Sequence, residues 1–473
     1  MIYEAHPGAW SLHPSINRLD WMYKSPIETQ ASIMPCCSTH APAQRAKDHL
    51  LSAQQRYEAR NPKSKVQHHR ATSYLPGGNT RSVLHATPFP LCMASGQGNR
   101  LVDLDGHVYL DYLGDMTAGL YGHSHPVILE TVTSTLTNIG PNLGGTTTAE
   151  ARFAEAICDR FSSVNQTRFC NSGTEANLYA LSVARQATAR SKAIVFEGAY
   201  HGGVLSFACG VDSNNIDKDD WILGRYNDAK GAVRLIVENK DVAAAVLVEP
   251  MQGAGGRIPG TAEILHAIQD AAKENGVIFI LDEVVTSRLA PGGLQSIVVH
   301  PDRGIPLSSD LTTLGKWIGG GLSISVFGGR RDLMSVYDPR TSSVHHSGTF
   351  NNNTLAMNVG CKAMTSVYTA DSCAALNALG DELRQGLQEL ATGTKMAITG
   401  IGAVKNIHFL PNGEKNGIST VRDLEVEPGS RGFWTARRGM LSLVLGTGRQ
   451  EVEQLLDAVK DFLEESRDLI AVQ

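Results

Sequence analysis

The sequence predicts an α/β fold built on a mostly parallel sheet. Between about residues 165 and 330, short runs rich in Val, Ile and Leu alternate with segments of helical periodicity. Such continuous apolar runs are typical of parallel strands whose sheet is covered by helices on both faces. With 473 residues, the chain is long enough for a large catalytic domain and a smaller second domain.

The composition excludes several function classes. Charged residues make up 19% of the chain and the formal net charge is -5, so no basic surface is available for nucleic acid or an anionic membrane. No segment approaches the ~18 consecutive apolar residues of a membrane span. The eight cysteines have no zinc-type spacing. We therefore expect a cytoplasmic small-molecule enzyme with reduced thiols, no metal site, and no nucleic-acid or membrane partner.

The predicted sheet strands are followed by polar or glycine-rich segments. Ligands bind beyond the carboxyl ends of parallel strands, so these segments are the first place to look for a site. A helix is expected from Thr174, and another carries Ile264, Leu265, Ile268 and Ala272 on its apolar face. The predicted strands are Thr-Arg-Phe-Cys (167–170), Lys-Ala-Ile-Val-Phe (192–196), Ala-Ala-Ala-Val-Leu-Val (243–248) and Gly-Val-Ile-Phe-Ile-Leu (276–281).

The rest of the chain forms a predicted small domain. An amphipathic helix is expected from about Pro42 to Asn61, and residues 96–112 alternate about Asp105-Gly106 as in a hairpin. After a helical segment from about residue 371 come a short strand-like segment and a last helix from Gln450 to about Ile470. The expected division is an N-terminal extension (1–45), the first part of the small domain (46–115), a large domain (116–370) and the second part of the small domain (371–473).

Four local features could carry chemistry. Ser172, Gly173 and Thr174 open a helix and could hold a phosphate, or could simply cap that helix. Asp282 ends a buried strand and could hold a protonated ring nitrogen, or could cap the next turn.

The other two features are a lysine and a tyrosine. Lys316 lies among apolar and small residues, where loss of hydration would lower its pKa and make it a usable amine nucleophile. The alternative is that Lys316, like most lysines, lies on a solvated face. Tyr200 precedes His201 and two glycines, and could stack on a planar cofactor or belong to the core. A phosphate site, a stacking ring, a strand-end Asp and a buried lysine are together what pyridoxal phosphate requires.

Six motifs in order carry a resemblance to a known family. They are SGTEAN (172–177), AYHGG (199–203), VEPMQG (248–253), DEV (282–284), TLGKWIGGG (313–321) and HSGTFNNN (346–353). From about Tyr74 to the C-terminal helix the chain resembles the class III aminotransferases, which are fold type I pyridoxal phosphate enzymes with a large domain and a smaller α+β domain. Within that class it is similar to the β-phenylalanine aminotransferase and glutamate-1-semialdehyde aminomutase group.

The resemblance implies roles for the cofactor-binding residues. Lys316 would be the catalytic lysine that binds the cofactor covalently, and Asp282 would pair with the pyridine nitrogen. Tyr200 and Val284 would lie on the two faces of the ring. Phosphate contacts are implied for Ser172, Gly173 and Thr174, a cofactor-side position for Glu249, and a phosphate contact from the partner subunit of a homodimer for Thr349.

Two arginines are implied as substrate-binding residues. Arg81 in NTRSVL matches the arginine that binds the substrate carboxylate in β-phenylalanine aminotransferase, and Arg438 in TARRGM matches one associated with the carboxylate of the keto acid. A guanidinium fork suits a carboxylate. Between Asp423-Leu424 and Gly432-Phe433 the chain is shorter than these relatives.

The expected reaction moves the amino group of a β-amino acid to 2-oxoglutarate or pyruvate. A 1,2-aminomutase of the glutamate-1-semialdehyde type and an amine transaminase are the alternatives within this fold. A catalytically inactive cofactor-binding protein and a nicotinamide dehydrogenase are the alternatives from other classes, although the glycine fingerprint of the latter is absent. The substrate side chain, stereochemistry, preferred acceptor and pathway depend on pocket shape, which the sequence does not define.

Overall fold

The computed structural model describes residues 51–342, 344–409 and 432–470. The chain divides into two compact units, Met1–Gln44 and Arg45–Gln473, and every described residue belongs to the second. The expected extension (1–45) and the shortened segment after Asp423 therefore lie outside the described residues. The helix expected up to Asn61 is confirmed over residues 51–60.

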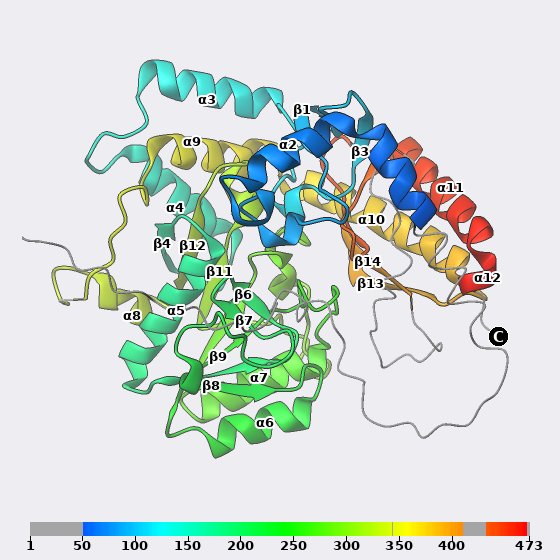
Figure 1. The fold of residues 1–473 in the computed structure, drawn as a ribbon. Coiled ribbons are helices and arrows are strands. Elements are labelled where there is room, and N and C mark those ends of the chain that lie inside the picture. Colours follow the sequence, from blue (N-terminus) through cyan, green and yellow to red (C-terminus); the bar gives the residue numbers. More distant parts are fainter. Residues whose placement is uncertain (1–50, 343, 410–431, 471–473) are drawn as a thin grey trace, which may run out of the picture. The chain divides into compact units, whose positions relative to one another are not determined.

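A seven-stranded sheet forms the centre of the unit (Figure 1). Strand β9 pairs in parallel with β5 and with β10. Strand β10 also pairs in parallel with β11, and β5 with β8. One strand, β12, runs antiparallel to both of its neighbours. The prediction of a mostly parallel sheet is confirmed. In spatial order the strands are β4 (Gln166–Cys170), β12 (Ser325–Gly329), β11 (Leu311–Leu314), β10 (Ile278–Asp282), β9 (Ala243–Val248), β5 (Lys192–Phe196) and β8 (Trp221–Gly224).

Helices cover both faces of this sheet. Helix α5 (Gly173–Thr188) packs on one face, and α6 (Ala229–Glu238) and α7 (Ala262–Glu274) pack on the other. Every residue of β9 is buried, and alternate side chains serve the two faces because the side-chain period of a strand is two. Leu247 joins the apolar cluster under α5, whereas Val246 joins the one under α6 and α7. The four apolar positions predicted on the second helix are all buried: Ile264, Leu265, Ile268 and Ala272.

Two smaller sheets and a short ribbon contain the other strands of the described residues. The predicted hairpin is confirmed, because two strands pair antiparallel around Asp105-Gly106. Its sheet has the order β1 (Met93–Gln97), β2 (Arg100–Asp103), β3 (Val108–Asp111) and β15 (Phe433–Trp434); the other has the order β13 (Met396–Ile401), β14 (Val404–Phe409) and β16 (Met440–Ser442). A short two-stranded ribbon pairs β6 (Tyr200–Gly202) with β7 (Leu205–Ser206).

The helix expected from residue 371 is α10 (Ala370–Ala391), and it packs against β13. The single helix expected from Gln450 to Ile470 is interrupted at Ser466, giving α11 (Arg449–Glu465) and α12 (Arg467–Ile470). The remaining α-helices are α2 (Pro62–Thr72), α3 (Pro126–Asn138), α4 (Thr148–Arg160), α8 (Arg331–Met334) and α9 (Thr354–Lys362). No helix in these described ranges is long and apolar enough to cross a membrane. The division expected at residues 115 and 370 stays a prediction.

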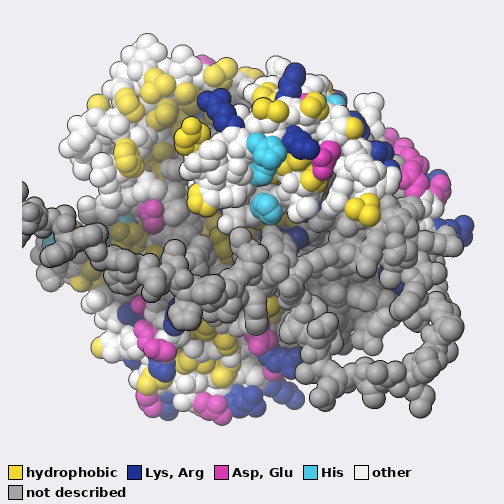
Figure 2. Space-filling view, viewed as in Figure 1, with side chains coloured by type: hydrophobic (Ala, Val, Ile, Leu, Met, Phe, Trp, Pro, Cys, Tyr) yellow, Lys and Arg dark blue, Asp and Glu magenta, His cyan; other side chains and the backbone are white. Residues whose placement is uncertain are grey.

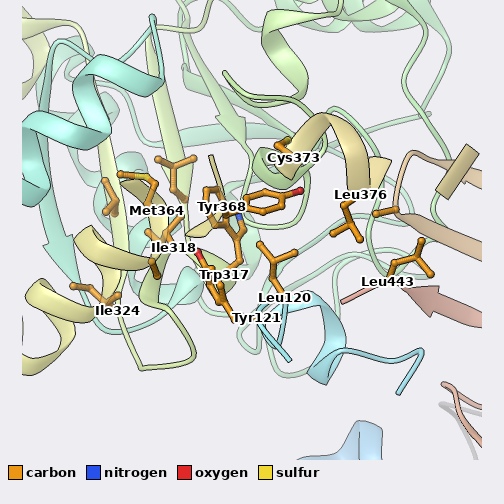
Figure 3. Close-up of a cluster of buried hydrophobic side chains, with 14 of the residues drawn as sticks. Leu120, Tyr121, Trp317, Ile318, Ile324, Met364, Tyr368, Cys373, Leu376 and Leu443 are labelled. Atoms are coloured by element: carbon orange, nitrogen blue, oxygen red, sulfur yellow. The ribbon is translucent and has the colours of Figure 1, made fainter. Parts of the chain in front are cut away.

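A large apolar core lies next to Lys316 and joins segments that are distant in sequence (Figure 3). Trp317 is fully buried, its indole Nε1 donates to Ser287 Oγ at 2.8 Å, and its ring meets the Tyr368 ring edge-on at 5.1 Å. The Arg160 guanidinium lies 4.8 Å from the Trp317 ring centroid, within cation–π range. The residue that follows Lys316 is therefore anchored in a close-packed core.

Candidate active site

Five sheet strands end at residues that the sequence analysis selected. Because β4, β5, β9, β10 and β11 all run in one direction, their carboxyl ends lie along one edge of the sheet. Ser172 follows β4, Tyr200 follows β5, Glu249 follows β9, Asp282 ends β10 and Lys316 follows β11. The fold thus brings the predicted residues to the edge where ligands bind in open α/β sheets.

The first turn of α5 presents backbone N–H groups and two hydroxyls at this edge. Ser172 is the N-cap, and its Oγ accepts from Glu175 N at 3.2 Å. Thr174 Oγ1 accepts from Gly203 N at 3.3 Å. A side chain at Gly202 could not be accommodated, because its Cβ would meet the Thr174 side chain and its φ is +139°. The N-terminus of this 16-residue helix has free backbone N–H groups and the positive end of the helix dipole, so it suits a phosphate group.

Asp282 is buried and held by three hydrogen bonds. Its Oδ2 accepts from Asn177 Nδ2 at 2.8 Å and lies 2.8 Å from His201 Nδ1, and its Oδ1 accepts from Val284 N at 3.0 Å. Burial alone would raise the pKa of Asp282, but the hydrogen bond and charge of His201 outweigh it and hold this pKa below its ordinary value. The carboxylate is therefore ionised at neutral pH and can accept from a further N–H donor.

Lys316 occupies a left-handed backbone conformation, with φ of +56°, at the start of a short 3-10 helix (Lys316–Gly319). Such strained non-glycine positions cluster at active sites. Burial lowers the pKa of Lys316 to about 8, and the nearby Asp282 charge opposes that shift. The amine is therefore neutral in a useful fraction of molecules near neutral pH, which a nucleophile or proton carrier requires.

Tyr200 and Val284 differ in exposure. The Tyr200 side chain is large and apolar yet 45% exposed. Val284 is buried against two glycines: a Cβ on Gly173 would lie 3.1 Å, and one on Gly315 3.3 Å, from Val284 Cγ1. Val284 is therefore an apolar buried side chain and Tyr200 an accessible ring, the two kinds of surface that contact a planar ligand.

Glu249 and Arg257 lie beneath this edge of the sheet, and both are more than nine-tenths buried. Glu249 Oε2 accepts from Tyr200 N at 3.1 Å and Oε1 from Gly253 N at 2.8 Å. Burial raises the pKa of Glu249 to about 7. Arg257 was not selected from the sequence; its Nη2 donates to Met440 Sδ at 2.7 Å.

The remaining residues predicted at the site are exposed in this single chain: Arg81, Thr349 and Arg438. Arg81 forms an ion pair with Asp115 at 2.6 Å, and Asp115, Met116 and Thr117 all have positive φ. Burial is the main cause of the lowered pKa of Lys316, and the charge of Arg81 makes a smaller contribution to it. Thr349 and Arg438 are exposed, and the backbone carbonyl of Arg438 accepts from Asn406 Nδ2 at 2.9 Å.

The chain was compared with known proteins. A family model described as aminotransferase class-III matches residues 83–445, which is more than half of the chain. The chain belongs to the class III aminotransferases. It is accordingly a pyridoxal phosphate-dependent transaminase with the fold type I architecture.

The chain is similar to class III aminotransferases from several organisms. An uncharacterized aminotransferase of Schizosaccharomyces pombe is 46% identical over 423 residues, which cover 88% of this chain and 95% of the relative. The beta-phenylalanine transaminase of Variovorax paradoxus is 41% identical over 438 residues, covering 90% and 97%. A solved beta-phenylalanine aminotransferase from V. paradoxus matches with a TM-score of 0.84 at 40% identity, covering 90% of this chain and 99% of that one. A glutamate-1-semialdehyde 2,1-aminomutase of Chlorobium luteolum is 35% identical over 337 residues, covering 68% and 76%.

The residues at the sheet edge fit the cofactor of this class, pyridoxal 5′-phosphate. The α5 terminus offers N–H donors for the phosphate, and the ionised Asp282 has acceptor capacity left for a ring N–H. The α5 terminus and the Asp282 carboxylate thus have the chemistry that the phosphate and the ring nitrogen of pyridoxal phosphate need.

Sequence reasoning missed the residues that hold Asp282. His201 was seen only as a neighbour of Tyr200, yet in β6 it points to the opposite side and is 2% exposed. Asn177 was part of a quoted motif but was given no role. The available signal was the period of two along a strand, which places neighbours such as Tyr200 and His201 on opposite faces.

Proposed function

We propose that this aminotransferase moves the amino group of a β-amino acid, with an aryl or alkyl substituent, to a 2-oxo acid such as 2-oxoglutarate or pyruvate. The observation that carries the proposal is the position of Arg81 near Tyr200 and Lys316. Burial raises the pKa of Tyr200, and the charge of Arg81 opposes this rise, so the two side chains interact electrostatically. A carboxylate held there would belong to a substrate bound over the cofactor site. The named Variovorax relative supports this substrate class.

In this proposal the chain's own residues divide the work. Bound pyridoxal phosphate supplies the electron sink that stabilises negative charge on the substrate carbon. Lys316 binds the cofactor through Nζ and carries a proton to and from the substrate carbon. Asp282 keeps the ring nitrogen protonated, and His201 and Asn177 orient that carboxylate. The residues proposed to hold the cofactor are Ser172, Gly173 and Thr174 at the phosphate, Tyr200 and Val284 at the ring, and Glu249 beside it.

The half-reactions can be followed by the visible absorption of the holoenzyme. Adding racemic β-phenylalanine should bleach the band of the bound cofactor, and 2-oxoglutarate should restore it. A yellow protein that ignores β-amino acids would overturn the proposed donor. The aminomutase relatives make a mutase the second candidate. A mutase needs no external 2-oxo acid, so turnover that continues without one would favour it.

Replacing Arg81 with alanine should lower kcat/KM for β-phenylalanine about 10- to 100-fold, the usual cost of a lost charge-assisted hydrogen bond. Activity toward 1-phenylethylamine, an aryl amine without a carboxylate, should change little. Arg81→Lys should also be impaired, because an ammonium does not reproduce the guanidinium fork. The control is Arg70→Ala, an exposed arginine in the last turn of α2. Equal losses with both donors would indicate an amine transaminase.

We also propose a homodimer in which Thr349 reaches the phosphate of the partner subunit. Apolar side chains are exposed on α3 and after it, and Figure 2 shows apolar side chains at the upper left, where Figure 1 places α3. This surface adjoins the Thr349 segment, because Asn352 Nδ2 donates to Gly145 O at 3.2 Å. The exposed apolar residues are Leu129, Leu136, Ile139, Leu143 and Phe350.

A second copy of the chain would bury this apolar surface. Sedimentation should therefore show a dimer. Leu143→Glu should weaken it and lower activity, whereas Val108→Glu, at an exposed position on the hairpin, should do neither. A fully active monomer would contradict this proposal.

A further inference from the structure

The first turn of α5 has the sequence of a capping box, Ser172-Gly173-Thr174-Glu175. In that motif the glutamate side chain accepts from the backbone N–H of the N-cap residue, which here is Ser172. The structure has a different arrangement: Glu175 Oε2 accepts from Asn171 N at 2.9 Å, one residue before the N-cap, and from Asn171 Nδ2 at 3.2 Å. Among the described residues, no hydrogen bond uses the N–H groups of Ser172, Gly173 and Thr174.

The Glu175 carboxylate is a potential competitor of a phosphate at this helix terminus. Free N–H groups and the positive end of the helix dipole attract any anion, and Glu175 lies within the first turn. In the capping-box position this carboxylate would occupy the N–H of Ser172 and repel a phosphate bound beside it. Its bonds to Asn171 therefore keep the first turn of α5 open for another anion.

Asn351 holds Asn171 in the orientation that retains Glu175. The two hydrogens of Asn171 Nδ2 go to Glu175 Oε2 and to Asn351 Oδ1, the latter at 3.0 Å and 180 positions away along the chain. Asn351 Nδ2 in turn lies 3.3 Å from His346 Nε2. Burial lowers the pKa of His346 to about 4, so its ring is neutral near pH 7 and Nε2 can accept from the Asn351 amide.

His346 is itself fixed by three aromatic rings. Its ring centroid lies 4.4 Å from that of Tyr179, 5.1 Å from that of Phe327 and 5.6 Å from that of Tyr337. The first two contacts are edge-on, a favourable geometry for aromatic pairs. Tyr179 belongs to α5 and Phe327 to β12, so His346 is anchored on the sheet and on the helix whose terminus is at issue. The Asn351 amide is therefore held by a well-packed part of the fold.

We propose that Asn351 is a positioning residue for the cofactor phosphate: through Asn171 it keeps the Glu175 carboxylate away from the N-terminus of α5. This rests on the proposed function, which places the phosphate at that helix terminus. Without the Asn351 side chain, the Asn171 amide loses one of its two acceptors and is free to turn. The capping-box position then becomes available to Glu175, and an incoming phosphate has to displace this carboxylate.

The test measures binding to the apoenzyme of pyridoxal phosphate and of pyridoxal, which lacks the phosphate. Asn351→Ala should raise the Kd of pyridoxal phosphate about 10-fold and leave that of pyridoxal nearly unchanged. Asn275→Ala is the matched control and should change neither Kd. Its amide also donates a hydrogen bond, to Ala271 O at 2.8 Å, but it lies after α7, at the opposite end of β10 from Asp282. An unchanged ratio of the two Kd values in Asn351→Ala overturns the inference.

A second substitution separates this role from a purely structural one. Glu175→Ala removes the competing carboxylate, so the double variant Asn351→Ala/Glu175→Ala should regain the wild-type affinity for pyridoxal phosphate. Asn351 N also donates to Gly348 O at 3.1 Å and closes the turn that carries Thr349, a backbone bond that alanine keeps. A defect that persists in the double variant overturns the proposal, because misfolding or a displaced Thr349 does not depend on the Glu175 carboxylate.

The titrations also distinguish this inference from the proposed function. No amino donor enters them, so the finding that the enzyme uses a donor other than a β-amino acid leaves their result intact. Equal wild-type affinities for pyridoxal phosphate and pyridoxal would contradict the phosphate site at α5, and with it the role of Asn351.

Discussion

Lys316→Ala should abolish multiple turnover and the visible band of the covalently bound cofactor. Proton transfer by a positioned side chain contributes about 10²–10⁴-fold, and this lysine is also the proposed attachment point, so kcat should fall by at least ~10⁴-fold. The Tm should stay close to that of the wild type, because alanine and lysine tolerate the φ of +56° about equally and Trp317 keeps its core contacts. Absorbance spectra and single-turnover kinetics check this result.

Lys273→Ala is the matched control for this experiment. Lys273 lies on α7 and is exposed, so its loss should change neither the spectrum nor the rate. Retention of wild-type turnover in Lys316→Ala would refute the assignment of the catalytic lysine. A colourless wild-type protein in the presence of added pyridoxal phosphate would refute the cofactor site built around it.

Asp282→Asn should lower kcat about 10²–10³-fold at neutral pH. Losing one partner of a buried charged pair costs ~2–5 kcal/mol, and ~1.4 kcal/mol corresponds to a factor of ten. The amide keeps the shape of the carboxylate but not the charge that holds a proton on the ring nitrogen. The variant should therefore recover part of its rate as the pH falls and solvent protonates the ring, whereas the wild type should not. A pH–rate profile measures the difference.

Asp310→Asn provides a comparison for Asp282→Asn. Asp310 also accepts from a backbone N–H, Phe279 N at 2.9 Å, and from an arginine, Arg330 Nη1 at 2.6 Å, but it lies at the opposite end of β10. Its loss should reduce stability without changing the pH dependence of the rate. An identical loss of rate at every pH in Asp282→Asn would contradict an electrostatic role for Asp282.

Much of the sheet and the positions of the site residues were predictable because their signals are local. Continuous apolar runs identified β5, β9 and β10, and the residue after each run lies at the edge where ligands bind. Alternate side chains of β9 point to opposite faces of the sheet, and helices cover both faces, so every residue of the strand is buried and apolar. Asp282 and Lys316 could therefore be selected from short segments.

The interactions that complete the site could not be predicted, because they join distant segments. His201 and Asp282 are 81 positions apart, and nothing in either segment specifies their 2.8 Å contact. Arg257 Nη2 likewise donates to Met440 Sδ, 183 positions away along the chain. The reversed direction of β12 also depends on its partners, since its five residues carry no directional signal.

The position of β12 has a consequence for synthesis of the chain. Strand β4 (residues 166–170), which precedes the proposed phosphate-binding turn, lies at the edge of the seven-stranded sheet, where its neighbour is β12 (residues 325–329). A nascent chain that has not yet emerged from the ribosome beyond residue 329 therefore leaves the backbone groups of β4 unpaired in this sheet. The proposed phosphate-binding turn therefore gains its paired strand only after most of the chain has been made.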